Sequence, residues 1–232
     1  MRKKKCLIGA SILLVLALAI VLVMVLYPGG TTGILAGLGN AEAQNSLGLC
    51  YARGDGVPEN FEKAVYWYQK AAKQGNAEAQ FRLGWCYDYG RGVEKNSEAA
   101  VYWLRKAAEQ GNPKAQFSLG VSYSQGEGVK KDPAEAAKWM RKAAEQGYSA
   151  AQCAMGMRYD DGNGVEKDPV EAVKWYTKAA EQGVGAAQFS LGMHYAEGDG
   201  VKKDPAEAAK WYKKAADQGD PTAKEALKKL GY

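Results

Sequence analysis

Few side chains in this sequence have the chemistry of an enzyme. His194 is the only histidine, so the His-Glu-x-x-His pattern of a zinc protease cannot occur. The nucleophile motifs Gly-x-Ser-x-Gly and Ser-x-x-Lys are also missing. The neighbouring acids Asp160 and Asp161 stand beside the glycines of a predicted turn, where solvated carboxylates are common. We therefore expect no enzymatic activity, no metal and no cofactor.

The elements that would position functional side chains are amphipathic helices. The stretch from Asp132 to Gly147 contains the start and end signals of one complete helix. Asp132 can cap the first turn, Pro133 lacks an N–H that the helix would not use, and Glu135 completes a capping box. Gly147 can adopt the left-handed conformation that closes a helix. Apolar residues between these ends recur at helical spacing, which gives the helix one face to bury.

This helix is repeated along the chain, and its tryptophan marks the interval. Tryptophans stand 36 residues apart at Trp67, Trp103, Trp139, Trp175 and Trp211. A period of this length is typical of solenoids and other repeat arrays. Each copy contains two helical patterns and no alternating strand pattern, so we predict an all-α solenoid of stacked helix-turn-helix repeats. We number the repeats 1 to 5 and place them at residues 40–75, 76–111, 112–147, 148–183 and 184–219.

Small residues recur with the same period. A glycine follows the central apolar residue of every first helix: Gly48, Gly84, Gly120, Gly156 and Gly192. A glycine inside a helix costs about 1 kcal/mol relative to alanine, so we expect a backbone or side chain to lie close to it. A Gly-x-Gly-Val turn then allows the chain to reverse. The alanines and tryptophan of the second helix should pack on a neighbouring repeat, because one repeat cannot bury them alone.

The segment 220–232 begins a further first helix. Asp220 can cap it, and Lys228 occupies the position of the repeated glycine. Because no further helix can press against a lysine there, we expect a terminal capping helix. Stacked repeats need such a polar end for solubility.

Four positions of the first helix vary between copies, on the face away from the repeated apolar residues. One of these columns contains Leu49, Trp85, Val121, Met157 and Met193. We interpret the four columns as a continuous concave groove for a partner, although they could also be unconstrained surface. Arginine, tryptophan and tyrosine dominate interface hot spots. The predicted partner-binding residues are Arg82, Trp85, Tyr89, Arg158, Met193 and His194.

The cysteines are not expected to form disulfides within the chain. Cys50 and Cys86 occupy the same position in neighbouring repeats, where equivalent helices lie about 8–10 Å apart. A disulfide requires Cα atoms within about 7 Å of each other. Cys153 replaces a phenylalanine of other copies and should belong to the core. His194 is three repeats away from Cys86, which argues against a metal cluster.

The first 39 residues differ from the repeats. Residues 1–5 carry four positive charges, residues 6–27 are uncharged and apolar, and residues 28–39 are rich in glycine. A helix over residues 6–27 would span roughly 33 Å, enough for a hydrocarbon core of about 30 Å. A cleavable signal has a shorter apolar region, followed by a cleavage site of small residues. No such site follows residue 27 directly.

We therefore predict a basic cytoplasmic stub, a single-pass transmembrane signal anchor and a flexible tether. The positive-inside rule places the N-terminus in the cytoplasm and the repeats outside it, on the periplasmic side if the cell is bacterial. The alternative is secretion after signal cleavage.

The charge of the chain argues against nucleic acid as a partner. The sequence has 31 basic and 26 acidic residues, and four of the basic residues precede residue 6. The remaining body is close to neutral, so it has no field that would attract phosphates.

The repeat at residues 186–219 contains Leu-Gly-Met-His-Tyr-Ala-Glu-Gly-Asp-Gly-Val and then Lys-Trp-Tyr-Lys-Lys-Ala-Ala-Asp-Gln-Gly. With its equivalents over residues 40–232, it resembles the Sel-one-like repeat family, a relative of tetratricopeptide repeats. The resemblance implies a right-handed superhelix that serves as a protein-interaction scaffold, with bacterial envelope members in complex assembly, signalling and polysaccharide export. A secreted branch has a disulfide in each repeat and is linked to penicillin-type ligands; this sequence lacks that cysteine pattern.

These observations predict a non-catalytic, membrane-anchored scaffold that binds protein partners through its concave face in the cell envelope. The alternative is a binding module for a cell-wall glycan, a peptide or a β-lactam-type ligand. A weak hydrolase is disfavoured by the missing nucleophile and base.

Overall fold

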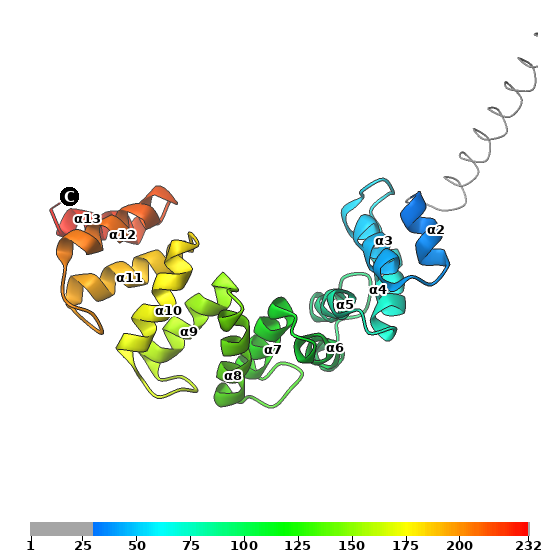
Figure 1. Cartoon of the computed structure of the whole chain (residues 1–232), viewed down its shortest axis with the longest axis horizontal. Coiled ribbons are helices and arrows are strands. Elements are labelled where there is room, and N and C mark those ends of the chain that lie inside the picture. The colour runs from blue at the N-terminus through cyan, green and yellow to red at the C-terminus, as the bar shows by residue number, and fades with distance from the viewer. Residues whose placement is uncertain (1–29, 232) are drawn as a thin grey trace, which may run out of the picture. The chain divides into compact units, whose positions relative to one another are not determined.

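The computed structural model of the chain describes residues 30–231, which form helices and no strand (Figure 1). The helices are α2 (Thr31–Gly37), α3 (Ala41–Arg53), α4 (Phe61–Lys73), α5 (Ala77–Tyr89), α6 (Ser97–Glu109), α7 (Pro113–Gln125), α8 (Pro133–Glu145), α9 (Ser149–Asp161), α10 (Pro169–Glu181), α11 (Gly185–Glu197), α12 (Pro205–Asp217) and α13 (Pro221–Lys229). For the described residues, this confirms the all-α class.

The helices belong to two compact units, which divide within α6 between Trp103 and Leu104. In unit 1, α2 packs on α3, α3 on α4, and α4 on α5. In unit 2, α7 packs on α8, and the same succession continues helix by helix to α13. Within each unit the repeats are therefore helix pairs stacked in chain order, which is the predicted solenoid arrangement.

The helices begin and end at the local signals in the sequence. Asp132 Oδ1 accepts a hydrogen bond from the Glu135 N–H at 2.9 Å, and Pro133 is the first residue of α8. The first helices of the repeats end at a glycine with positive φ, as at Gly162, where φ is +70°. These caps satisfy backbone groups that a helix end leaves without partners.

Two glycines show why small residues recur in every repeat. A Cβ added to Gly156 of α9 would lie 2.6 Å from Cδ1 of Tyr176, on the second helix of the same repeat. A Cβ on Gly164, whose φ is +77°, would meet the carbonyl of Pro133 in the preceding repeat. The expected close approach is confirmed, and it occurs both within one repeat and between two.

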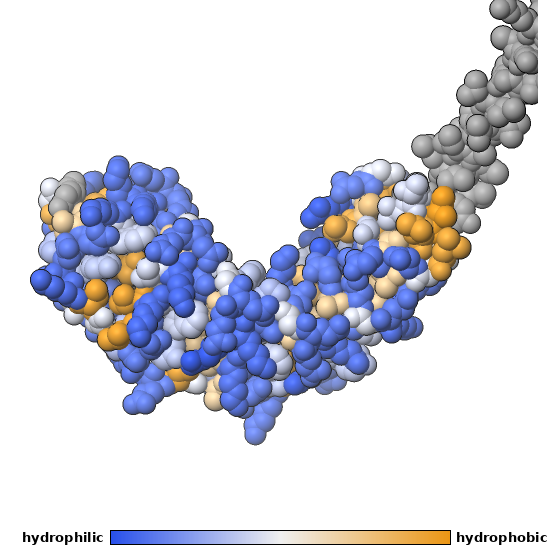
Figure 2. Space-filling view, in the orientation of Figure 1, coloured by the Kyte–Doolittle hydropathy of each residue, from blue (hydrophilic) through white to orange (hydrophobic). Residues whose placement is uncertain are grey.

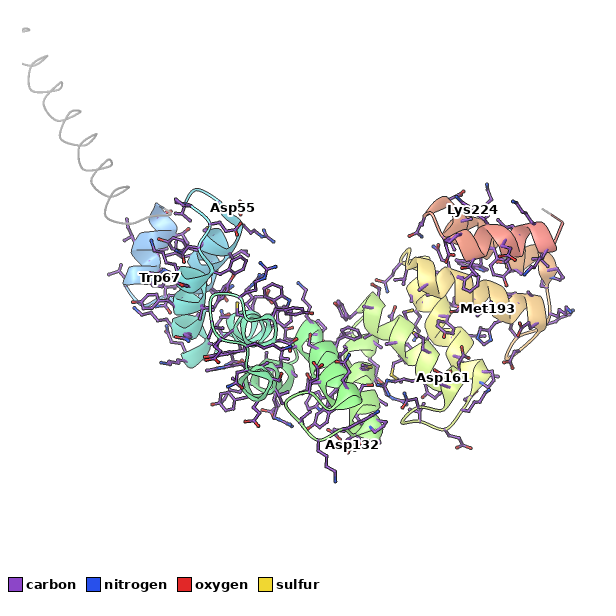
Figure 3. The ribbon with its side chains drawn as sticks, turned by 180° about the vertical axis from the view of Figure 1, so that it is seen from behind. Asp55, Trp67, Asp132, Asp161, Met193 and Lys224 are labelled. Carbon is purple, nitrogen blue, oxygen red and sulfur yellow. The ribbon has the colours of Figure 1, made fainter. Side chains whose placement is uncertain are left out.

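The apolar core of each unit follows the repeated pattern. In unit 1 it includes the fully buried Leu47 and Leu83, and in unit 2 it includes Met155 and Leu191. The tryptophans at the repeat interval are less uniform than expected. They are 8% exposed at Trp139, 7% exposed at Trp175 and half-buried at Trp67 (on α4, Figure 3), Trp103 and Trp211. The indoles therefore close the core at its margin and do not lie at its centre.

Several of the repeated lysines cover these indoles. Lys142 Nζ lies 4.1 Å from the Trp139 ring centroid, and Lys214 Nζ lies 3.8 Å from that of Trp211. Cations over aromatic rings contribute about 0.5–1 kcal/mol at exposed sites. These lysines, which recur at the tryptophan interval, therefore shield the edge of the core.

A ladder of glutamines, not anticipated from the sequence, connects neighbouring repeats. Gln152 Nε2 donates to the Ala144 carbonyl of the preceding repeat at 3.1 Å, and Gln182 Nε2 donates to Gln152 Oε1 at 2.6 Å. The buried Gln80 and Gln188 donate in the same way to Ala72 and Ala180. Each buried amide thus finds a partner across the repeat junction, as a second donor to a helix-end carbonyl that already accepts from a backbone N–H.

The same contact corrects the prediction of a flexible tether over residues 28–39. Its described part contains α2, and Ala36 of this helix is 1% exposed. Gln44 Nε2 donates to the Ala36 carbonyl at 3.1 Å, as Gln80 does to Ala72. α2 therefore stands where a preceding repeat would end, because its apolar side chains can cover the first face of repeat 1.

The C-terminal end of unit 2 is formed by α13, within the segment predicted to cap the repeats. Asp220 Oδ1 accepts from the N–H groups of Thr222 and Ala223, and Ala223 is fully buried. Lys228 is exposed at the position of the repeated glycine. Within residues 30–231, none of the helices is long and apolar enough to cross a bilayer. The predicted span, residues 6–27, lies outside the described residues.

Candidate binding site

α5 presents the aromatic side chains that the sequence singled out. Trp85 is 38% exposed and Tyr89 is 63% exposed. Their ring centroids lie 4.9 Å apart at an interplanar angle of 34°. Arg82, one turn before Trp85, pairs through Nη2 with Glu78 Oε1 at 2.6 Å. Three of the predicted partner-binding residues thus lie together on one face of α5.

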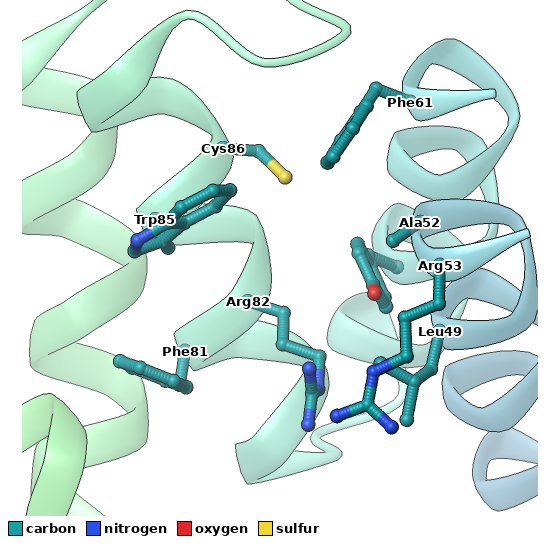
Figure 4. Close-up of a pocket in the computed structure, with 9 residues that line it drawn as sticks. Leu49, Ala52, Arg53, Phe61, Phe81, Arg82, Trp85 and Cys86 are labelled. Atoms are coloured by element: carbon teal, nitrogen blue, oxygen red, sulfur yellow. The ribbon is translucent and has the colours of Figure 1, made fainter. Parts of the chain in front are cut away.

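A cavity of about 310 Å³ opens beside these residues, within unit 1. We call it the unit 1 cavity. Its walls come from α3, from the start and middle of α4, and from α5 (Figure 4). The lining residues are Leu49, Ala52, Arg53, Phe61, Tyr68, Phe81, Arg82, Trp85 and Cys86.

Charged and apolar groups occupy different ends of the unit 1 cavity. Figure 4 shows the guanidinium groups of Arg53 and Arg82 together at one end, away from Phe61 and Cys86. Arg82 Nε is buried and has no hydrogen-bond partner among the described residues. Arg53 is exposed and forms no ion pair within residues 30–231. The cavity therefore combines apolar walls with unused cationic N–H donors.

The other polar groups in the cavity are neutral. Burial raises the pKa of Tyr68 to about 12, although the positive charges of Arg82 and Arg53 act in the opposite direction. Burial also raises the pKa of Cys86 to about 11, again opposed by Arg82. Because both groups keep their protons at neutral pH, the ionised groups that line the cavity are the two arginines.

Arg158 was expected on an open groove, but it is buried between repeats 3 and 4. It is 6% exposed, and burial lowers its pKa. Its Nη1 donates to the Asn163 carbonyl at 2.9 Å, Nη2 donates to Ser124 Oγ at 2.9 Å, and Nε lies 3.1 Å from Met140 Sδ. The expected position is corrected because these contacts hold the guanidinium inside unit 2.

His194 is likewise buried, between repeats 4 and 5. It is 6% exposed, with Nδ1 2.8 Å from the Asp199 carbonyl and Nε2 3.2 Å from the Asp160 carboxylate. The Tyr176 hydroxyl donates to Asp160 Oδ2 at 2.9 Å. Met193, the residue before His194 on α11 (Figure 3), is 37% exposed. The column that contains Arg158 and His194 therefore faces the neighbouring repeat.

The sequence pattern placed Leu49 in a variable column, but it did not indicate that Phe61, Tyr68 and Phe81 line a cavity. Phe81 recurs as Phe117 and Phe189, and Tyr68 recurs as Tyr176 and Tyr212, so neither stands out from the repeat. Phe61 lies at the start of a second helix. The equivalents of Phe61 are serine or proline: Ser97, Pro133, Pro169 and Pro205. This departure from the repeat was a usable signal, because an aromatic ring at a first helical position has no capping role.

The cysteines that the structure describes are free thiols. Cys50 is half-buried, Cys86 is 1% exposed and Cys153 is 9% exposed in the unit 2 core. Burial raises the pKa of Cys153. Within residues 30–231, no group of three or more histidine, cysteine or acidic side chains is placed to hold a metal ion.

Solved structures of other proteins share this fold. A protective antigen of uropathogenic Escherichia coli that displays an SLR fold is 43% identical with a TM-score of 0.82, over 84% of this chain and 42% of its own. A Sel1 repeat protein from Oxalobacter formigenes is 46% identical with a TM-score of 0.74, over 81% of this chain and 75% of its own. The chain thus spans less than half the length of the E. coli antigen.

A more distant relative is the immunity protein Pa5087 from Pseudomonas aeruginosa. It is 25% identical with a TM-score of 0.51, over 79% of this chain and 67% of its own. Comparison with curated protein sequences gives no significant match.

The family described as Sel1 repeat matches the chain five times. The matched residues are 41–76, 77–112, 113–148, 149–184 and 185–220. Each match begins one residue after the repeat predicted from the tryptophan interval. The matches cover most of the sequence, so the chain belongs to the Sel1 repeat family.

Proposed function

We propose that this protein is a non-catalytic scaffold that binds a protein partner through the surface of α5. Sel1 repeat proteins generally mediate protein–protein interactions. The observation that carries the proposal is the exposed pair of Trp85 and Tyr89, whose rings contact each other on the face of α5 where Arg82 and Trp85 line the unit 1 cavity. These three residue types supply most interface hot spots, and aromatic rings lose little conformational entropy on binding.

We further propose that residues 6–27 hold this scaffold at a membrane, with the repeats on the extracytoplasmic side of the cell envelope. Their length, their lack of charge and the cations before them support this part of the proposal. Membrane fractions should retain the full-length chain after an alkaline wash and release it only with detergent. A chain that washes off, or a purified chain that starts after residue 27, would contradict the anchor.

The test of partner binding is site-specific photocrosslinking in cells. A photoreactive phenylalanine analogue replaces Trp85 in one variant and Met157 in a second, matched variant. Met157 occupies the equivalent position in repeat 4 and is 53% exposed, so it controls for contact with any nearby protein. We expect a discrete protein adduct from position 85 that is absent from position 157.

The partner identified in this way should bind the purified chain in solution. Arg82→Ala combined with Trp85→Ala should weaken that binding at least about tenfold, the effect of losing about 1.4 kcal/mol, without lowering the melting temperature. If position 85 yields no adduct, or if the double variant binds normally, the proposed function is wrong. If the double variant unfolds early, these side chains belong to the core.

A second candidate is a binding module for a cell-wall peptide, glycan or β-lactam-type ligand. The volume of the unit 1 cavity favours it, because about 310 Å³ lies at the lower end of the range for small-molecule pockets. Retention of the purified chain on isolated cell wall, without any protein adduct from position 85, would favour this reading over the scaffold.

A further inference from the structure

The unit 1 cavity has counterparts at two junctions between repeats of unit 2, where side chains of the protein occupy the central space. Beside Asp160 and His194 a smaller cavity of about 140 Å³ remains. Three equivalent positions define each junction: one near the end of a first helix, one on the second helix, and one on the next first helix. They are Ala52, Tyr68 and Cys86 between repeats 1 and 2; Ser124, Met140 and Arg158 between repeats 3 and 4; and Asp160, Tyr176 and His194 between repeats 4 and 5.

In unit 2 the third residue of each junction is large and polar. Arg158 reaches both Ser124 Oγ and Met140 Sδ, which are the other two positions of its junction. His194 lies 3.2 Å from Asp160, and its ring centroid is 5.7 Å from that of Tyr176. At these two junctions the space between the three positions is therefore bridged by a side chain of the protein itself.

In unit 1 the same position is Cys86, and the residue opposite is Ala52. Neither side chain is long enough to reach across, so the space remains open as the unit 1 cavity. Phe61, Tyr68 and Trp85 provide its apolar walls. The cavity is thus a consequence of two small residues at a junction whose equivalents between repeats 3 and 4 and between repeats 4 and 5 carry a large polar side chain.

The ionised groups at one end define what could enter. Glu78 already pairs with Arg82 through Nη2, but Arg82 Nε has no hydrogen-bond partner among the described residues, and Arg53 adds a second positive charge. Guanidinium groups bind carboxylates through paired, charge-assisted hydrogen bonds. Apolar walls beside two cations match an apolar side chain with a carboxylate next to it.

We propose that the unit 1 cavity receives one apolar side chain of a partner polypeptide, with an adjacent carboxylate of that polypeptide bound by Arg53 and Arg82. This inference rests on the proposed function and specifies the chemistry of the partner at the same surface. The partner would then carry an acidic residue directly beside an aromatic or large aliphatic residue.

The test measures peptide binding to the full-length chain in detergent. The probe is a fluorescein-labelled, end-blocked peptide Gly-Ser-Glu-Phe-Gly-Ser, followed by fluorescence anisotropy. Matched peptides replace its Glu with Gln or its Phe with Ala. We expect each replacement to weaken binding at least about tenfold, since each removes one of the two recognised groups. Equal binding of the three peptides, or no binding of the first, overturns the inference.

A variant that fills the unit 1 cavity provides the sharpest test. Ala52→Asp combined with Cys86→His installs, at the first junction, the pair that already packs at Asp160 and His194. We expect peptide binding to fall at least about tenfold while the melting temperature is kept. The matched control, Asp160→Ala combined with His194→Cys, should leave peptide binding unchanged.

If the filled variant does not fold, Arg53→Gln replaces it, because Arg53 is exposed and outside the core. Its peptide affinity should fall and lose part of its dependence on salt. The inference is overturned if the cavity-filling variant folds and binds the peptide as the wild type does, or if Arg53→Gln does so. A protein that crosslinks at position 85 but is not displaced by the acidic peptide would leave the proposed function standing and exclude this cavity as its binding site.

Discussion

Equivalent helices form the junction between repeats 1 and 2 and the junction between repeats 4 and 5. The side chains at the equivalent positions of these two junctions differ. The first contains Ala52 and Cys86 and encloses a cavity with two arginines at one end. The second contains Asp160 and His194, which contact each other at 3.2 Å, with Tyr176 bound to the same carboxylate. Two positions, one in each of the neighbouring repeats, thus decide whether a junction contains a hydrogen-bonded pair of side chains or a cavity.

The surface of the two units differs in a related way. Unit 1 exposes Trp85 and Tyr89 as a contacting aromatic pair, whereas unit 2 exposes the methionines Met157 and Met193. Figure 2 shows apolar residues on the view drawn there as scattered areas among polar ones. A solenoid can therefore keep one repeated core and vary only junction and surface positions, which is where we place function.

The largest expected contrast comes from the third junction position. Arg158→Ala removes hydrogen bonds from a charged donor and leaves a cavity in unit 2, so we expect it to destabilise the fold by about 3 kcal/mol. Cys86→Ala at the equivalent position in unit 1 should cost about 1 kcal/mol. Chemical denaturation of the full-length chain measures both. Equal losses of unfolding free energy in the two variants would show that the hydrogen bonds of Arg158 do not stabilise the fold.

The second prediction concerns alkaline pH and unit 1. The pKa of Cys86 is raised from 9.0 to about 11, so the stability gained by burying the neutral thiol is complete below about pH 9. It is lost as pH rises toward 11, because the unfolded chain releases the proton first. We expect a loss of about 2 kcal/mol over this range. Tyr68, with a pKa of about 12, extends the decline to higher pH.

The control for this pH effect is Cys86→Ala, which has no thiol to titrate at that position. The difference in unfolding free energy between the wild type and this variant should shrink from pH 8 to pH 10.5. A difference that stays constant over this interval would mean that burial does not hold the Cys86 thiol in its neutral form.

The third prediction tests whether the filled junction acts as one unit. Asp160→Ala, His194→Ala and their combination form a double-mutant cycle in unit 2. Because the two side chains share a hydrogen bond, we expect a coupling free energy of about 1 kcal/mol. The cycle is measured by denaturation at neutral pH. Strictly additive losses would show that the residues fill the junction independently.

The smallest expected effect is a difference in thiol reactivity. Alkylation requires the thiolate, and Cys86 is buried with a raised pKa, whereas Cys50 is half-buried. At pH 8 iodoacetamide should modify Cys50 about tenfold faster than Cys86 or more. Mass spectrometry of the digested protein measures the two rates. Similar rates would mean that the unit 1 junction opens readily in solution.

Much of the helical framework was predictable because its signals are local. The helix expected from Asp132 to Gly147 is α8, which runs from Pro133 to Glu145. The cluster of Arg82, Trp85 and Tyr89 could also be predicted from the sequence, since spacings of three and four residues place side chains on one helix face. The tether prediction failed at α2 because a seven-residue helix is stabilised by packing on α3 rather than by its own propensity.

The positions of Arg158 and His194 could not be predicted in this way. Each follows an exposed methionine by one residue, and one residue turns a helix by about 100°. That rotation places the side chain at the border between the outer face and the neighbouring repeat. Helical spacing alone cannot tell on which side of this border a long polar side chain will lie.

The amino-acid sequence determined the repeat length, the helix ends and the face each helix buries, because these depend on contacts within a few residues. Tertiary structure alone decided which junctions are filled and which is open. That outcome depends on whether a side chain on one repeat reaches a partner 34 residues earlier, as Arg158 reaches Ser124 and His194 reaches Asp160.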